Sequence, residues 1–144
     1  MIIRLLSSQI PTFWEAIKFS VVQVREIRER DRQRYLNGLL HDLLSDKAQC
    51  FVRLSDKRML IGLLITKIII DKISGEKSLS LQTLYSWRSV DDREWSSDFL
   101  FVKEFAKYEE CSCILFETEH PRIRQISEFL GFREKHRVYI YTLE

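Results

Sequence analysis

The sequence contains few of the residues that build tight phosphate-binding loops. It has four glycines and two prolines among its 144 residues, and no glycine lies between positions 76 and 130. A glycine-rich phosphate loop is therefore excluded from that stretch. No Pro/Gly-rich linker, internal repeat or low-complexity tract divides the chain, so we expect one domain over residues 1–144.

Cysteine, net charge and long apolar runs are also scarce. Three cysteines are an odd number, and Cys111 and Cys113 lack the neighbouring ligands that a zinc site needs. We therefore expect reduced thiols in a cytoplasm and no metal site. A net charge of +2 does not by itself predict binding to nucleic acid or to a membrane. The chain shows neither a run of roughly 18 apolar residues nor a signal-type start.

Hydrophobic periodicity predicts the element order β-α-α-β-β-β-α-β-α-β. Three hairpin-linked strands followed by strand–helix alternation indicate an α/β protein (an α+β mixed sheet) with helices on the faces of the sheet. The expected strands are 1–6, 49–54, 59–70, 78–87, 113–118 and 138–143. The expected helices begin near residue 10, cover the leucine-rich segment 36–44, run from about 92 to 110, and run from 121 to 130.

The last third of the chain gives the sharpest local signals. Pro121 suits the first turn of a helix, and Gly131 suits a left-handed cap at its end. Residues 138–143 then alternate in the manner of a closing strand. We expect Phe129 and Phe132 to be buried beside that strand.

This ending resembles the end of the GNAT N-acetyltransferase fold. The resemblance rests on the Leu-Gly-Phe motif at 130–132, on the Ile-Gly pair at 61–62 and on the element order, which extends it over the whole chain. It implies a GNAT-like fold in which strands 78–87 and 113–118 run parallel and splay apart at their C-terminal ends. It also implies N-acyl transfer to an amine, with acetyl-CoA (acetyl-coenzyme A) as the acyl donor.

The resemblance further implies where such a cofactor would bind. In this family a strand supplies amides to the pantetheine arm, and the next helix start holds the pyrophosphate between glycines. Here Asp91 takes the position of the usual Arg or Gln, while Glu94 and Ser96 take those of the glycines. The implied binding amides are those of Leu84, Tyr85 and Ser86 on the strand and of Trp95, Ser96 and Ser97 at the helix start.

Carboxylates crowd this helix start. Asp91, Asp92, Glu94 and Asp98 would oppose a pyrophosphate, and Arg88 and Arg93 are the offsetting charges. Acidic residues are also what a helix without a ligand prefers at its N-terminus. Two interpretations stay open, a capped helix start and a cofactor loop, and the composition favours the capped helix.

The resemblance implies three catalytic candidates. Counting back from the Leu-Gly-Phe motif, His120 replaces the usual Asn, and Ser127 replaces the Tyr that often protonates the leaving thiolate. A serine hydroxyl is a much weaker acid than a phenol, so Ser127 is a poor substitute. His120 could exchange protons near neutrality, although a histidine before a proline is also a common turn residue. Glu117 is the third candidate. It alternates with Glu119 along the fifth strand, so only one of the two could face a cleft, and a hydrated or salt-bridged role is favoured.

The segment 25–34, with sequence REIRERDRQR, contains five arginines and three acids. Its arginines could contact phosphates, but the spacing favours a solvated helix face with intrahelical ion pairs, so we expect no nucleic-acid partner. Two functions remain open for the chain. One is a divergent N-acyltransferase that acts mainly by positioning an amine substrate. The other is a degenerate, non-catalytic module that binds a protein partner, as small phage or mobile-element domains of this fold do.

Overall fold

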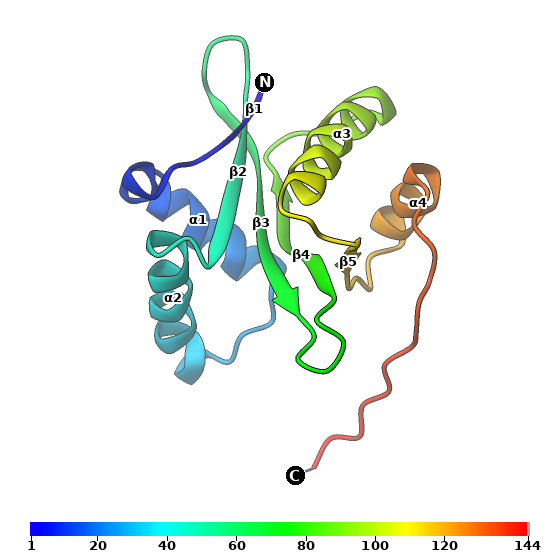
Figure 1. Ribbon diagram of the computed structural model, residues 1–144. Helices are drawn as coiled ribbons and strands as arrows, with labels where there is room; N and C mark the ends of the chain where they lie inside the picture. The colour runs from blue at the N-terminus through cyan, green and yellow to red at the C-terminus, as the bar shows by residue number, and fades with distance from the viewer. Residues whose placement is uncertain (144) are drawn as a thin grey trace.

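The computed structural model describes residues 1–143 and shows a five-stranded mixed sheet with helices on both faces (Figure 1). The strands are β1 (Ile2–Arg4), β2 (Ala48–Leu54), β3 (Leu60–Ile70), β4 (Lys77–Ser86) and β5 (Cys113–Phe116). The helices are α1 (Ile10–Val24), α2 (Glu29–Leu44), α3 (Asp92–Tyr108) and α4 (Pro121–Leu130), with a short 3-10 turn, η1 (Ser7–Gln9), before α1.

The strands lie in the order β1-β2-β3-β4-β5, and each neighbouring pair is antiparallel except the last. β4 and β5 are parallel and are joined by α3, which confirms the expectation for strands 78–87 and 113–118. The predicted mixed fold and element order are thus confirmed as far as α4.

Two hydrophobic cores lie on opposite faces of the sheet. Phe51 and Val52 are neighbours in β2 and point to opposite faces because side chains alternate along a strand. Val52 packs in the core under α1 and α2, which includes Ile17. Phe51 packs in the core under α3, which includes Val102. Burial in the first core raises the pKa of the Cys50 thiol to about 12, so this cysteine is unreactive.

The start and end of α4 confirm the predicted signals. Pro121 lies at the first helical position, and Gly131 follows the helix with φ +96°, the left-handed conformation expected of its cap. The Phe132 amide donates to the Ser127 carbonyl oxygen at 2.9 Å, which satisfies one of the last carbonyls of the helix.

The predicted closing strand over residues 138–143 is wrong. These residues belong to an extended C-terminal tail, defined here as residues 133–143, which leaves the end of α4 and runs away from the sheet (Figure 1). The expected burial of Phe129 is also wrong, because its side chain is 58% exposed when no strand covers it. Phe132 is half-buried, but it packs on Phe99 and Phe116 instead of on a closing strand.

Candidate functional site

β4 and β5 pair over only the first half of β4, and we call the unpaired edge of β4 beyond this point the opening. Their pairing extends from Ser78 opposite Cys113 to Leu81 opposite Phe116, where β5 ends. β4 continues to Ser86 without a partner on that side within the described residues. The register with β3 shifts at the same point, so Gln82 forms a bulge. Pairing of the two parallel strands thus stops at the place where they are expected to splay apart.

The backbone of β4 presents alternate amides to this opening. The Trp87 amide donates to Ile61 of the β3 side at 2.9 Å, and Ser86 lies opposite Gly62. In an antiparallel pair, hydrogen-bonded and non-hydrogen-bonded positions alternate, so the Leu84 and Ser86 amides point away from β3. Of the three strand residues expected from the sequence, Leu84 and Ser86 thus direct amides to the opening. The Tyr85 amide is directed to β3.

The N-terminus of α3 lies beyond the end of β4 and is already partly capped. The first four amides of a helix have no acceptor inside it. Here Asp91 accepts from the Glu94 amide through its side chain at 2.8 Å and from the Trp95 amide through its carbonyl at 3.0 Å. The amides of Asp92 and Arg93 are the ones in the first turn for which Asp91 supplies no acceptor. Those of the other two expected residues, Ser96 and Ser97, lie deeper in the helix, where helix geometry supplies acceptors.

Arg53 of β2 neutralises part of the acidic cluster and was missed by the sequence reasoning. Its guanidinium lies 2.6 Å from an Asp98 carboxylate oxygen and 2.8 Å from a Glu94 oxygen. Arg88 contacts the same Glu94 oxygen at 2.8 Å. Glu94 is therefore held between two guanidinium groups, and the exposed Asp91 and Asp92 are the carboxylates nearest the helix start that these two arginines do not contact. Asp92 has a longer contact of 3.8 Å with Arg122.

The pKa values of Glu94 and Asp98, the two carboxylates paired with Arg53, shift in opposite directions. The hydrogen bond from Arg88 lowers the pKa of Glu94, and the positive charge of Arg53 lowers it further. Burial raises the pKa of Asp98, and it outweighs the attraction of Arg53. Glu94 is thus the firmly ionised member of the cluster.

Aromatic side chains border the opening on the α1 face. Tyr85 makes edge-on contacts with Phe19 of α1 at 5.7 Å and with Trp87 at 4.9 Å between ring centroids. Phe19 and Trp87 stack at 6.3 Å, and both remain exposed. We call Phe19, Tyr85 and Trp87 the aromatic wall.

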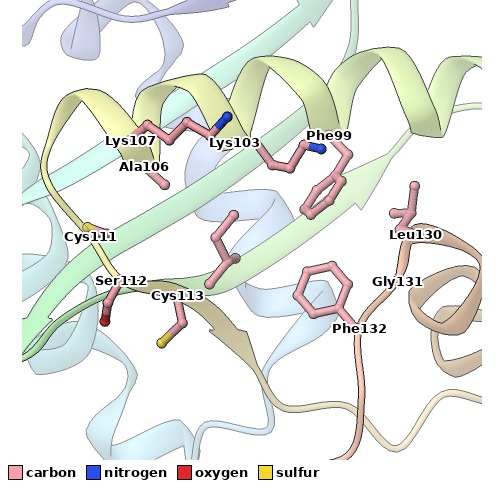
Figure 2. A pocket seen from close by; sticks show the side chains of 11 residues that line it. Phe99, Lys103, Ala106, Lys107, Cys111, Ser112, Cys113, Leu130, Gly131 and Phe132 are labelled. Carbon is pink, nitrogen blue, oxygen red and sulfur yellow. The ribbon is translucent and has the colours of Figure 1, made fainter.

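A groove of about 340 Å³ lies on the α3 face, beside β5 and the end of α4 (Figure 2). Phe132 lies across it from Phe99, with ring centroids 5.1 Å apart. Lys103 and Lys107 of α3 line it as well. The groove is therefore largely apolar at its centre and basic along one side.

The three catalytic candidates lie at or near α4. His120 is the N-cap of this helix, and its Nδ1 accepts from the Arg122 amide at 3.1 Å. The Ser127 hydroxyl donates to the Ile123 carbonyl oxygen at 2.6 Å. Glu117 follows β5 and is exposed. Among residues 1–143, no hydrogen bond or ion pair joins the side chains of His120, Ser127 and Glu117.

The arginine-rich segment 25–34 is divided between two environments. α2 begins at Glu29, and Asp31 pairs with Arg34 at 3.0 Å, as expected for a solvated helix face. Arg25 behaves differently. Its guanidinium lies 3.4 Å from both the carbonyl and the side-chain oxygen of Gln82 and stacks over the Tyr35 ring. This arginine therefore supports the β4 bulge beside the opening.

Two wider features concern the described part of the chain as a whole. No helix in residues 1–143 has the length and apolar character needed to cross a membrane. In the same range, no group of three or more His, Cys, Asp and Glu side chains is arranged to hold a metal ion.

No protein-family model matches the chain, and no curated protein matches it by sequence. Solved structures do match over nearly its full length. A predicted acetyltransferase from Clostridium acetobutylicum, solved with acetyl-CoA, gives a TM-score of 0.75 at 9% identity and covers 99% of this chain and 95% of its own. The aminoglycoside antibiotic 6'-N-acetyltransferase AAC(6')-Ih from Acinetobacter baumannii gives a TM-score of 0.70 at 16% identity. This match covers 100% of this chain and 97% of that protein. AAC(6')-Iy, in complex with the bisubstrate analogue CoA-S-monomethyl-acetylneamine, gives a TM-score of 0.71 at 17% identity. This match also covers 100% of this chain and 97% of that protein.

Proposed function

We propose that this chain, which has the fold of the GNAT acetyltransferases, is an acyl-coenzyme A-dependent N-acyltransferase that acts on an amine. The observation that carries the proposal is the opening between β4 and β5, with the Leu84 and Ser86 amides directed into it. Backbone amides at an unpaired strand edge can bind an extended amide-containing chain as a further strand would. The pantetheine arm of acetyl-CoA has that chemistry.

The fit to the phosphate end of the cofactor is poorer. The amides of Asp92 and Arg93 are the donors left at the start of α3, and the Arg93 side chain is exposed nearby. Arg88 is already bound to Glu94. Asp91 occupies the amide of Glu94 and adds a negative charge. We therefore propose binding through the strand amides, with a weakly held pyrophosphate.

Bound acetyl-CoA would supply a thioester as the acyl donor. The residues of this chain would contribute mainly by positioning, because the Ser127 hydroxyl is engaged with a helix carbonyl. His120 uses Nδ1 as a cap acceptor, which leaves its Nε2 for proton exchange. The aromatic wall would border an acceptor amine that enters from the α1 face, since amines with a positive charge bind well against aromatic rings.

A second candidate function is a non-catalytic, protein-binding or assembly module with a degenerate cofactor site. The observation that favours it is that side chains of the protein itself occupy the N-terminus of α3. Asp91 accepts from the Glu94 amide, and the Glu94 carboxylate bridges Arg53 and Arg88. As such a module, the chain would serve a phage or a mobile element. For either function we place the chain in the cytoplasm, in keeping with its free thiols.

Calorimetry with acetyl-CoA, followed by mass spectrometry of a panel of amines incubated with it, tests the proposal. Leu84→Pro removes one amide directed to the opening and leaves the β3 ladder intact, so it should abolish saturable binding. Leu84→Ala is the matched control, because it keeps the amide. Circular dichroism shows whether both variants are folded. Absence of both binding and acetylated product with the parent protein would favour the binding module.

A further inference from the structure

Arg25 borders the start of the opening. It follows α1 and is half-buried, and its Nη1 lies 3.4 Å from both the carbonyl and the side-chain oxygen of Gln82. Gln82 comes directly after Leu81, the last residue of β4 that pairs with β5. Within residues 1–143, no ion pair joins Arg25 to an Asp or Glu side chain. In that part of the chain its positive charge is therefore unpaired.

The Arg25 guanidinium has free donors for an anion. An arginine carries five N–H donors in a planar fork. Both contacts with Gln82 use Nη1, and they are longer than the about 2.7–2.9 Å that is typical of a hydrogen bond to a carboxylate. In the described residues, Nε and Nη2 make no hydrogen bond, and the Tyr35 ring supports the group from one side. The Nε–Nη2 edge can thus donate two parallel hydrogen bonds to one carboxylate.

The aromatic wall borders the other end of the opening. Tyr85 and Trp87 lie at the end of β4 and just after it, and Phe19 reaches them from α1. Phe19 is 46% and Trp87 40% exposed, so their ring surfaces are accessible to a ligand. Phe19 precedes Arg25 by six positions, which corresponds to roughly 9 Å along a helix axis. A small molecule with a carboxylate at one end and an aromatic ring at the other can contact both.

We propose that the acceptor amine is an aromatic α-amino acid, whose carboxylate binds Arg25 and whose ring packs on the aromatic wall. The proposal rests on the acyltransferase function proposed above and names its substrate class. An α-amino acid carries its amine one carbon from the carboxylate, so a carboxylate bound to Arg25 keeps the amine near the start of the opening. Charge argues against a polycation as the acceptor, because Arg25 would repel it and β4 carries no acidic residue to attract it.

The transfer needs no reactant besides the amino acid and the acyl donor. The α-ammonium group loses one proton to solvent, and the neutral nitrogen attacks the thioester carbonyl of acetyl-CoA. A C–N bond forms, the C–S bond breaks, and the proton that the nitrogen then loses converts the leaving thiolate to a thiol. The products are an N-acetyl amino acid and coenzyme A.

A chemical-shift titration of the full chain without acetyl-CoA, followed at the Trp87 indole, tests the proposal. L-Phenylalanine should bind at least about tenfold more tightly than phenethylamine, which lacks the carboxylate. It should also bind at least about tenfold more tightly than L-alanine, which lacks the ring. Arg25→Gln should remove the first difference and keep the second. Arg28→Gln, at an exposed arginine three positions on, is the matched control and should keep both.

The same titration separates carboxylate binding from support of the β4 bulge. If Arg25→Gln weakened L-phenylalanine and phenethylamine by the same factor, Arg25 would act through Gln82 and the proposal would be overturned. Equal affinity of the parent protein for the two ligands, or no binding of L-phenylalanine, would also overturn it, and neither result depends on a variant that folds.

Mass spectrometry after addition of acetyl-CoA distinguishes this proposal from the acyltransferase function itself. The parent protein should acetylate L-phenylalanine in preference to phenethylamine, and Arg25→Gln should raise the KM for the amino acid at least about tenfold. Acetylation of amines without preference for the amino acid would refute the substrate class and keep the acyltransferase. Preferential binding of L-phenylalanine without any acetylated product would refute the acyltransferase and keep the carboxylate site.

Discussion

Arg53 and Asp98 join the centre of the sheet to the helix that covers it, with 2.6 Å between a guanidinium nitrogen and a carboxylate oxygen. They lie on β2 and α3 and are 45 positions apart in the sequence. Both side chains are mostly buried, and Arg53 also contacts Glu94 at 2.8 Å. One arginine thus fixes the first two turns of α3 against the strand beneath it.

Removal of this arginine should destabilise the fold. Arg53→Ala leaves the Asp98 carboxylate mostly buried without its cation, which should cost about 1–3 kcal/mol of the free energy of unfolding. Arg93→Ala, an exposed arginine on the same helix, should change it by less than about 0.5 kcal/mol. Urea denaturation measures both. Equal losses in the two variants would contradict the role assigned to Arg53.

Acid should weaken the fold partly through Glu94. Its pKa is lowered in the folded protein, chiefly by Arg88, so its stabilising contribution is present above the unfolded pKa and is lost as the pH falls through the folded pKa. Asp98, whose pKa is raised, acts in the opposite sense, because its contribution falls as the pH rises. Glu94→Gln should therefore flatten the loss of thermal stability on acidification below the ordinary glutamate pKa of 4.5. A melting profile that keeps its slope in this variant would assign the acid sensitivity to other groups.

Two glycine substitutions should have opposite signs. Gly131 has φ +96°, and Gly131→Val should lower the free energy of unfolding by about 1 kcal/mol or more, although an added Cβ would meet no atom within 4 Å. Gly38 lies inside α2 with the same open surroundings, so Gly38→Ala should raise it by about 0.5–1 kcal/mol. Thermal melts of the two variants beside the parent measure both effects. An unchanged melt for Gly131→Val would mean that the cap conformation is unstrained by a side chain.

Acetyl-CoA should bind weakly, with a dissociation constant of about 100 μM or more, equivalent to less than roughly 5.5 kcal/mol. Glu94→Gly with Asp91→Arg removes two carboxylates from the helix start and releases Arg88, so we expect at least about tenfold tighter binding. Ser97→Ala is a control on the same helix that leaves these charges in place. Calorimetry decides the matter, and a micromolar constant for the parent would refute the weak site.

The arginine-rich segment should not bind nucleic acid. Arg28 and Arg32 are both exposed, and replacing them by Gln should leave any partner affinity nearly unchanged. An anisotropy titration at several salt concentrations measures this. Micromolar affinity whose salt slope falls by roughly one unit for each lost arginine would show phosphate contacts instead.

Local signals in the sequence were sufficient for most of the fold. The Gly131 cap and the parallel β4–β5 pair follow from short-range pattern and element order. The cluster of Arg53 with Glu94 was not predictable, because it joins residues 41 positions apart and charge type alone does not specify which arginine turns inward. The prediction of a strand in the C-terminal tail failed for a different reason. Its residues 138–143 have the periodicity of a strand, but a strand also needs a neighbouring edge, and periodicity carries no information about where that edge is.

The contact between Arg25 and Gln82 couples the opening to the opposite layer of the protein. Arg25 follows the end of α1, and Gln82 is the bulge that comes directly after the last residue of β4 paired with β5. We therefore expect the position of β4 at the opening to depend on how firmly α1 packs against the sheet. A molecule bound at the opening should then slow hydrogen exchange in the last turn of α1. Loosening that helix by mutation should raise the rate at which the same molecule dissociates.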